Sequence, residues 1–218
     1  MTIELTLLSA VSHRGREITA PRLRGLLALL AGELRAGCGA ARLVDGLWGD
    51  EQPENPTKAL QILVSRARKQ LGAEVIAGTP TGYRLTLRED QVDTSAVLLF
   101  AAAAAEKARA GDHAGALAEA AEGLALWDGA PAEGKAELGD PVGELRAARA
   151  STRRSLARSR ALALSRTGRR GEAVGPLAEL VAGRPHDEEL LLELMRCQTA
   201  TSGPAAALAA YDLSLIHI

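Results

Sequence analysis

The sequence is poor in aromatic residues and in cysteine. Only 2% of its 218 residues are Phe, Trp or Tyr. A hydrophobic core must therefore come from Leu, Ala and Val, which favours packed helices over a β-sandwich. Cys38 and Cys197 lie far apart and belong to no CxxC or Cys/His cluster. This excludes a disulfide framework and a structural zinc site as organising principles, and we expect neither a metal nor a cofactor.

Long hydrophobic runs are also missing. The longest one covers residues 96–105, ten in all, which is too short to cross a bilayer. The first five residues, Met-Thr-Ile-Glu-Leu, do not form a basic segment followed by an apolar one, so nothing there marks the chain for secretion. We expect a cytoplasmic protein without membrane contact.

Patterns that carry catalysis are lacking as well. The four histidines are scattered and form neither a His-Glu-x-x-His motif nor a Ser/His/Asp arrangement. Residues 129–136 approach a phosphate-binding loop, but Ala136 stands where a Ser or Thr would hold magnesium. We therefore expect no catalytic residues and no enzyme.

Charge is nearly balanced overall but uneven locally. The chain has 26 basic and 27 acidic residues. One segment, residues 55–72, carries Lys58, Arg66, Arg68 and Lys69 and no acidic residue. Local charge matters more than net charge for a nucleic-acid surface. Charge alone does not distinguish such a surface from the solvated face of an ordinary helix.

The first part of the chain mixes strands and helices. Alternating apolar and polar residues predict a strand, a turn and a return strand within residues 3–19. A helix is expected over residues 21–36, with Thr19 as a candidate cap, and the Gly-Cys-Gly segment at 37–39 ends it. A second, shorter helix is expected over residues 41–47.

The third predicted helix is the most informative. Asn55 is a good N-cap, Pro56 suits the first helical position, and Gly72 ends the helix. At 100° per residue the apolar side chains share an arc about 100° wide. The apolar arc contains Leu60, Leu63, Val64, Ala67 and Leu71, and the opposite arc contains Lys58, Gln61, Ser65, Arg68 and Lys69. A strand, a turn at 78–82 and a second strand then predict a hairpin ending near residue 87.

This order of elements predicts a winged helix-turn-helix with an extra N-terminal sheet. In a helix-turn-helix the second helix enters the major groove of DNA. Lys and Arg can bond phosphate or guanine, Gln can bond adenine, and Ser can bond either kind of partner. The alternative of a small α+β domain with a solvated basic helix stays open. The residues expected to contact DNA are Lys58, Gln61, Ile62, Ser65, Arg66, Arg68, Lys69 and Arg84.

Several motifs resemble those of one family, the Streptomyces antibiotic regulatory proteins (SARP). Its members join an OmpR-type winged helix to an all-helical bacterial transcriptional activation domain. The resemblance covers the chain to about Tyr211, and it implies a recognition helix at 55–72 and a wing at 74–88. The segments that carry it are Leu47-Trp48-Gly49-Asp50, Pro53, the run from Lys58 to Gly72, and Gly82-Tyr83-Arg84-Leu85.

The resemblance also implies a function. It indicates a sequence-specific activator, typically of a biosynthetic gene cluster, that binds direct repeats in double-stranded promoter DNA and recruits RNA polymerase. The helical domain would support a homodimer, and the protein would lie in the bacterial cytoplasm at the nucleoid. A rival interpretation is a protein-interaction scaffold of tetratricopeptide (TPR) type without specific DNA binding.

The second part of the chain is helical and repetitive. Similar Ala-Leu or Ala-Val pairs follow glycine-containing turns, and two of them, at residues 173 and 207, are 34 residues apart, the TPR period. The 57 residues between 116 and 173 require an extra helix or loop, for which residues 128–140 are the expected loop. Asp187 could cap the next helix. We expect an all-α, TPR-like activation domain over residues 93–218 after an OmpR-type winged helix over residues 1–90.

Two features of this part are unusual. Nine arginines and no acidic residue lie between positions 145 and 170. They form either an exposed helix face whose stems cover apolar surface, or a second contact to DNA or to an acidic partner, with acids at 187–189 neutralising part of the charge. After Tyr211 the chain reads Asp-Leu-Ser-Leu-Ile-His-Ile in place of the family's arginine-rich helix. We therefore expect the last repeat to be truncated.

Overall fold

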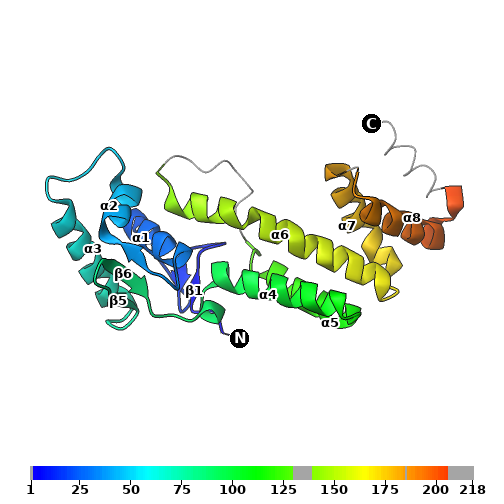
Figure 1. The fold of residues 1–218 in the computed structure, drawn as a ribbon, viewed down its shortest axis with the longest axis horizontal. Helices are drawn as coiled ribbons and strands as arrows, with labels where there is room; N and C mark the ends of the chain where they lie inside the picture. Colours follow the sequence, from blue (N-terminus) through cyan, green and yellow to red (C-terminus); the bar gives the residue numbers. More distant parts are fainter. Residues whose placement is uncertain (1, 130–138, 185, 206–218) are drawn as a thin grey trace. The chain divides into compact units, whose positions relative to one another are not determined.

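The computed structural model describes residues 2–129, 139–184 and 186–205 (Figure 1). Two compact units are present. The first contains Met1–Leu99 and Leu126–Ser151, and the second contains Phe100–Ala125 and Thr152–Ile218. Within the described residues, no helix is both long and apolar enough to cross a membrane.

The first unit begins with a small antiparallel sheet. Its strands β1 (Leu5–Thr6), β2 (Ser12–His13) and β3 (Arg16–Glu17) pair in chain order. Arg14 and Gly15 connect β2 to β3 and both have positive φ, 49° and 75°. Two such residues in succession are typical of a tight hairpin turn. The predicted strand, turn and return strand correspond to β1, the turn after β2, and β3, but β2 itself is an unpredicted strand and each strand has only two residues.

Three helices follow this sheet. They are α1 (Pro21–Gly32), α2 (Ala40–Trp48) and α3 (Pro56–Leu71). The prediction that the first helix reaches residue 36 is wrong, because the chain turns after Gly32 to bring residues 38 and 39 into a sheet. The cap prediction is also wrong, since Ala20 is the N-cap and no side chain caps the helix.

A second sheet joins the segment after α1 to the hairpin after α3. Its strands β4 (Cys38–Gly39), β6 (Gly82–Leu85) and β5 (Ile76–Gly78) lie in the order β4-β6-β5. The sequence predicts only the end of a helix at residues 37–39, so β4 is an unpredicted strand. A Cβ atom on Gly82 would lie 2.2 Å from the carbonyl oxygen of Cys38, so the two backbones approach this closely only with glycine at that position.

The core of the first unit is aliphatic, as the shortage of aromatic residues predicts. It joins both sheets and all three helices to Val92 and to Val142 and Leu145 of α6 (Pro141–Arg166). The compact unit therefore includes segments on both sides of the expected boundary at residues 90–93, and that boundary stays a prediction. The fully buried large side chains of this core are Leu5, Leu7, Ile18, Leu26, Leu27, Leu30, Leu43, Leu60, Ile76 and Leu85.

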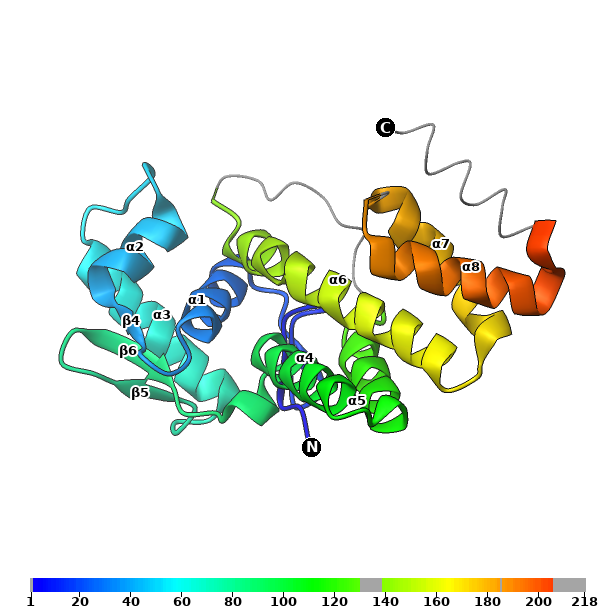
Figure 2. The same cartoon turned by 45° about the vertical axis from the view of Figure 1, so that its right-hand side comes forward.

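The second unit is helical (Figure 2). It contains α5 (His113–Ala125), α7 (Arg170–Gly183) and α8 (Glu188–Ser202), with the later part of α4 (Asp93–Arg109) and of α6. Helices α7 and α8 lie side by side and bury their apolar faces together.

Two sequence predictions for this unit are confirmed. The extra element between residues 116 and 173 is α6, and the carboxylate of Asp187 accepts a hydrogen bond from the Leu190 N–H at 3.2 Å at the start of α8. Most of the expected loop at 128–140, the whole phosphate-loop-like run after Gly129, and the repeat pair at 207–208 lie outside the described residues.

Candidate nucleic-acid interface

Helix α3 is defined at both ends by local chemistry. The side-chain oxygen of Asn55 accepts a hydrogen bond from the Lys58 backbone N–H at 2.9 Å, and Pro56 occupies the first turn. Such a cap stabilises a helix by about 1 kcal/mol. The helix ends at Gly72, whose φ of 120° suits glycine. The cap and the helix end predicted from the sequence are confirmed.

One face of α3 packs against α1 and α2. Leu60, Val64, Ala67 and Leu71 are buried, and Leu63 is half-buried. These are the residues of the predicted apolar arc. Because α2 and α3 are joined by only residues 49–55, burial of this face fixes the pair as a helix-turn-helix and directs the rest of α3 outward.

The outward face of α3 carries most of the residues predicted to contact DNA. Ile62 exposes 44% of its surface, one of four exposed large hydrophobic residues among those the structure describes. An exposed isoleucine amid polar groups suits contact with a thymine methyl group. The exposed residues of this face are Lys58, Gln61, Ile62, Ser65, Arg66 and Lys69, and we call them the α3 outer face.

Arg68 does not join them. Its Nε–H donates a hydrogen bond to the carbonyl of Ile76 at 2.9 Å, and its guanidinium lies 5.9 Å from the ring centroid of Tyr83. At 100° per residue Arg68 is only about 40° from Val64 around the helix, so it borders the buried arc. The prediction that Arg68 projects with the polar arc is wrong, because the side chain ties α3 to both strands of the hairpin.

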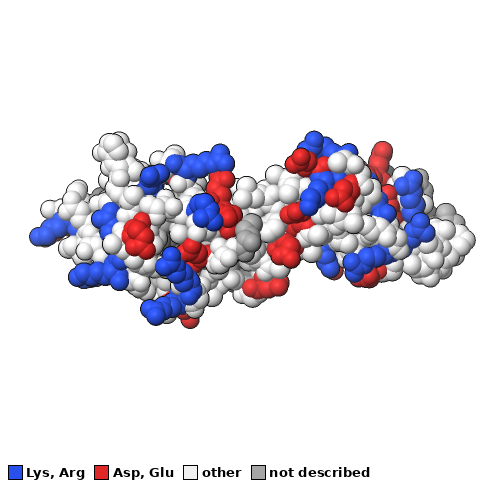
Figure 3. Space-filling view, turned by 90° about the horizontal axis from the view of Figure 1, so that it is seen from below, with Lys and Arg blue, Asp and Glu red and all other residues white. Residues whose placement is uncertain are grey.

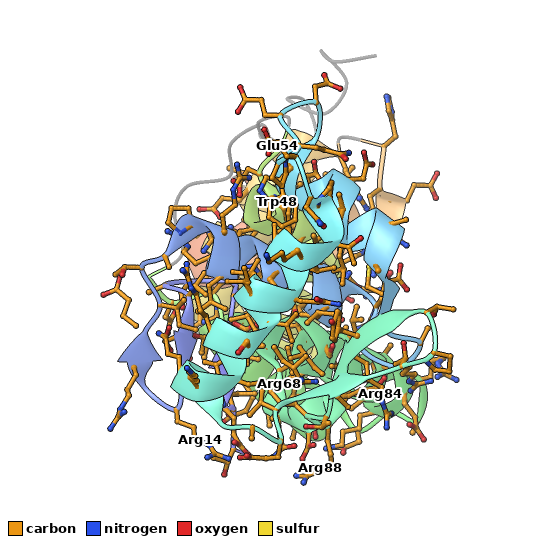
Figure 4. All side chains as sticks on the ribbon, turned by 90° about the vertical axis from the view of Figure 1, so that its left-hand side faces the viewer. Arg14, Trp48, Glu54, Arg68, Arg84 and Arg88 are labelled. Carbon is orange, nitrogen blue, oxygen red and sulfur yellow. The ribbon has the colours of Figure 1, made fainter. Side chains whose placement is uncertain are left out.

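Tyr83 is not among the residues predicted to contact DNA, although the sequence holds a signal for its position. Successive residues of a strand point to opposite faces, so Tyr83 and Arg84 on β6 cannot both face solvent. Tyr83 is half-buried against the core and under Arg68, whereas Arg84 is exposed. Figure 4 shows Arg68 between helix and hairpin, with Arg84 farther along the hairpin.

The tip of the hairpin is short and internally bonded. The Thr79 hydroxyl accepts a hydrogen bond from the Gly82 N–H at 3.0 Å, and the Thr79 N–H donates to the Gly82 carbonyl at 2.9 Å. The neighbouring Ala40 N–H donates to the Thr81 carbonyl at 2.9 Å. These bonds give the wing a fixed shape beside α3 and keep Arg84 at its surface.

The basic groups of this surface are available for phosphate. Among the residues that the structure describes, Lys58, Arg66, Lys69 and Arg84 have no ion-pair partner. Acidic side chains are nevertheless interspersed with basic ones on the face that Figure 3 shows. On that face the positive charge does not form one broad patch. No group of three His, Cys, Asp or Glu residues in the described ranges is placed to hold a metal ion.

The arginine-rich segment of α6 is largely engaged within the protein. Arg158 pairs with Asp187 and Glu189, and Arg166 also bonds Glu189, so the predicted neutralisation by acids at 187–189 is confirmed. In the first unit Arg146 and Arg149 donate to backbone carbonyls. The engaged arginines include Arg146, Arg149, Arg158, Arg166 and Arg169.

Comparison with known proteins matches both parts of the chain to regulators. Residues 92–215 match the bacterial transcriptional activator domain. The chain is 32% identical over 96% of its length to the regulatory protein AfsR of Streptomyces griseus, and 33% identical over 88% to AfsR of Streptomyces coelicolor. It is 32% identical over 58% of its length to the transcriptional regulator RedD of Streptomyces coelicolor. The chain spans 22% and 19% of the two AfsR proteins and 39% of RedD.

A solved structure shares the fold. EmbR of Mycobacterium tuberculosis, determined in complex with a low affinity phosphopeptide, superposes with a TM-score of 0.79 over 97% of this chain and 58% of that chain, at 23% identity. The fold is accordingly a winged helix-turn-helix followed by an all-α, TPR-like part, as predicted from the sequence.

Proposed function

Since the chain belongs to the SARP-type transcriptional regulators that carry the bacterial transcriptional activator domain, we propose that it activates transcription by binding promoter DNA in a sequence-specific manner. The α3 outer face carries this proposal. Its polar and basic side chains project from a capped helix whose opposite side is buried, and its cations have no ion-pair partner among the described residues.

The residue types divide into two kinds of contact. Lys58, Arg66 and Lys69 bind phosphates and fix the position of α3 in the major groove. Gln61 and Ser65 read base edges, because an amide can bond adenine at two points and a hydroxyl can donate or accept. Both lie on the α3 outer face described above.

Two further side chains complete the contact. Ile62 packs on a thymine methyl group, and Arg84 on the wing binds the backbone beside the groove. Arg68 contributes by holding the hairpin against α3 through its bonds to Ile76 and Tyr83. Its direct contact with DNA remains a prediction.

The finer features of the function follow from the family. We propose that the protein binds direct repeats, that two copies occupy them, and that the TPR-like part recruits RNA polymerase to the promoter of a biosynthetic gene cluster. The site of action is then the nucleoid in the cytoplasm. The match of residues 92–215 to the activator domain supports the recruiting role.

Fluorescence anisotropy with a labelled promoter fragment tests the DNA-binding surface. The double variant Lys58→Ala/Gln61→Ala should bind at least about tenfold more weakly, because it loses one phosphate contact and one bidentate base contact. The slope of log K against log salt should fall by about 1 in magnitude, since one phosphate contact is lost.

Arg16→Ala is the matched control, because Arg16 is an exposed cation of the same unit, on β3 and outside the α3 outer face. It should bind as the unmodified protein does. Equal affinity of the double variant and the control would remove α3 as the recognition helix.

A further inference from the structure

A groove in the second unit has the composition of a site for an acidic peptide. Its volume is about 440 Å³, within the range of ligand sites in proteins. Helices α4 and α6 supply most of its lining, and all of the lining residues belong to the second unit. We call it the α4–α6 groove.

The floor of the α4–α6 groove is small and apolar. Ala105 and Ala108 of α4 and Leu162 and Ala163 of α6 line it. Ser155 and Ser159 also line the groove, and among the described residues their hydroxyls have no hydrogen-bond partner. Such a floor accepts small apolar side chains and leaves polar groups for a peptide backbone.

The rim of the groove is cationic. Arg109, Arg158 and Arg166 line it together with His113, against the single acid Glu189. Arg109 is exposed and has no ion-pair partner among the described residues. Asp187 also pairs with Arg158, and Glu193 lies 3.8 Å from Arg166, so acids of the chain match this arginine pair. Arg109 is the arginine of the rim that is left for a carboxylate-bearing partner.

The groove already binds one carboxylate of the chain itself. Glu189 on α8 accepts hydrogen bonds from both Arg158 and Arg166, and the two guanidinium groups hold the pKa of that carboxyl below its usual range. Because Glu189 remains exposed, a carboxylate from another molecule can compete for the same two arginines. The groove therefore contains an arginine pair, Arg158 and Arg166, that binds a carboxylate. Beside this pair lies Arg109, which has no carboxylate partner among the described residues.

We propose that the α4–α6 groove binds a short acidic segment of a partner protein, with Glu189 occupying the arginine pair until that segment arrives. A protein segment fits better than DNA, since the apolar floor between the helices suits side chains whereas phosphates need no such floor. This site does not depend on the function proposed for α3.

Anisotropy of a fluorescein-labelled peptide of alternating Glu and Leu tests the proposal on the full chain. Arg109→Glu should weaken binding about tenfold or more, and Arg109→Gln about three- to tenfold, because a charge-assisted contact is lost. Glu189→Gln should tighten binding several-fold, because it removes the carboxylate that Arg158 and Arg166 share and leaves only Asp187 and Glu193 beside them. A purely structural role for Glu189 predicts no gain.

Three comparisons complete the test. Arg160 lies on the same helix as Arg158 but about 200° around it, so Arg160→Glu should leave binding of the peptide unchanged. Peptides with Gln or Lys in place of Glu should not bind, and Lys58→Ala/Gln61→Ala should bind the acidic peptide normally. The proposal would be overturned if Arg109→Glu bound the peptide with unchanged affinity, or if Glu189→Gln bound it no more tightly. It would also be overturned if the Gln peptide bound equally well, or if Arg109→Glu lost binding of duplex DNA and kept binding of the peptide.

Discussion

Among single residues, Asp93 links two distant segments of the first unit through hydrogen bonds to the backbone. Its carboxylate is buried and accepts hydrogen bonds from the backbone N–H groups of Leu7, Leu8 and Thr94 at 2.7, 2.8 and 2.6 Å. Arg146, whose Nε–H donates to the Leu7 carbonyl at 2.8 Å, adds a favourable charge. These bonds fix the segment after β1 to the start of α4.

Burial of Asp93 makes a pH-dependent contribution to stability. Desolvation raises its pKa from 3.8 to about 6, despite the three N–H donors and Arg146. Between these two values the folded state binds more protons than the unfolded state. The contribution of this group to the free energy of unfolding therefore falls as the pH rises from about 4 to 6, by roughly 3 kcal/mol in total, and is level above 7.

Urea unfolding followed by tryptophan fluorescence measures this effect, because Trp48 and Trp127 both lie in the first unit. As the pH rises through this interval, the free energy of unfolding of the unmodified protein should fall relative to that of Asp93→Asn. Surface carboxylates whose pKa is lowered raise the free energy of unfolding as the pH rises. They are present in both proteins, so their effect cancels in the comparison. A difference that does not change with pH would contradict the account of Asp93.

Arg68 gives a second prediction for a single side chain. Arg68→Ala should lower the free energy of unfolding of the first unit by about 1–2 kcal/mol, because the bond to Ile76 and the contact with Tyr83 are lost. Lys58→Ala is the control and should change stability by less than about 0.5 kcal/mol, since Lys58 is exposed. If Arg68→Ala keeps full stability but loses DNA binding, Arg68 is a DNA contact as the sequence predicts.

For whole elements, the sequence predicts what depends on local chemistry. The cap at Asn55, the apolar arc of α3, the hairpin and the cap at Asp187 all follow from residues close in the chain. The early end of α1 and the strand β4 could not be predicted in this way. Both result from pairing of Cys38 with Tyr83, a residue 45 positions farther along.

The orientation of arginines was equally hard to predict. Periodicity places Arg68 at the edge of an arc, but only the position of the hairpin shows that a carbonyl and a ring lie within its reach. Likewise, the exposed or engaged state of the α6 arginines depends on acids and carbonyls from distant segments. Six of the eight predicted DNA-contact residues do lie together on the α3 outer face, because that prediction needed only the helical period.

The approach of β4 to β6 leads to a prediction about the hairpin. Gly82→Ala should destabilise the first unit by about 2 kcal/mol or more, because its Cβ would overlap the Cys38 carbonyl. Gly78→Ala is the matched control in the same sheet, as nothing lies within 4 Å of a Cβ built there. Thermal unfolding by circular dichroism checks both variants. Equal melting temperatures would contradict the close pairing of these strands.

For the whole molecule, net charge gives little information about DNA binding. A net charge of −1 at pH 7 coexists with the basic outer face of α3, because acids elsewhere balance it and much of the arginine-rich α6 segment is engaged internally. The proposed specific binding to DNA would then depend on a few contacts of α3 and the wing, and we expect it to weaken steeply as salt concentration rises.

The proposed binding to direct repeats makes a prediction about the spacing of the repeats. Two copies in the same orientation contact one face of the duplex only if the repeats are about one helical turn, 10–10.5 base pairs, or a multiple of it apart. Inserting five base pairs between the repeats should abolish cooperative binding, and inserting ten should restore part of it. Gel-shift titrations of the three fragments measure this. Cooperativity that does not depend on the insertion would exclude paired binding.

Selection of binding sites from fragmented genomic DNA, carried out in parallel with the unmodified protein and with Gln61→Ala, tests the reading of DNA by α3 most directly. The account predicts that the unmodified protein enriches a repeated motif and that Gln61→Ala relaxes the preference at a single base pair of each repeat. If no motif is enriched, or if both proteins enrich the same motif with equal strength, the outer face of α3 does not read the sequence.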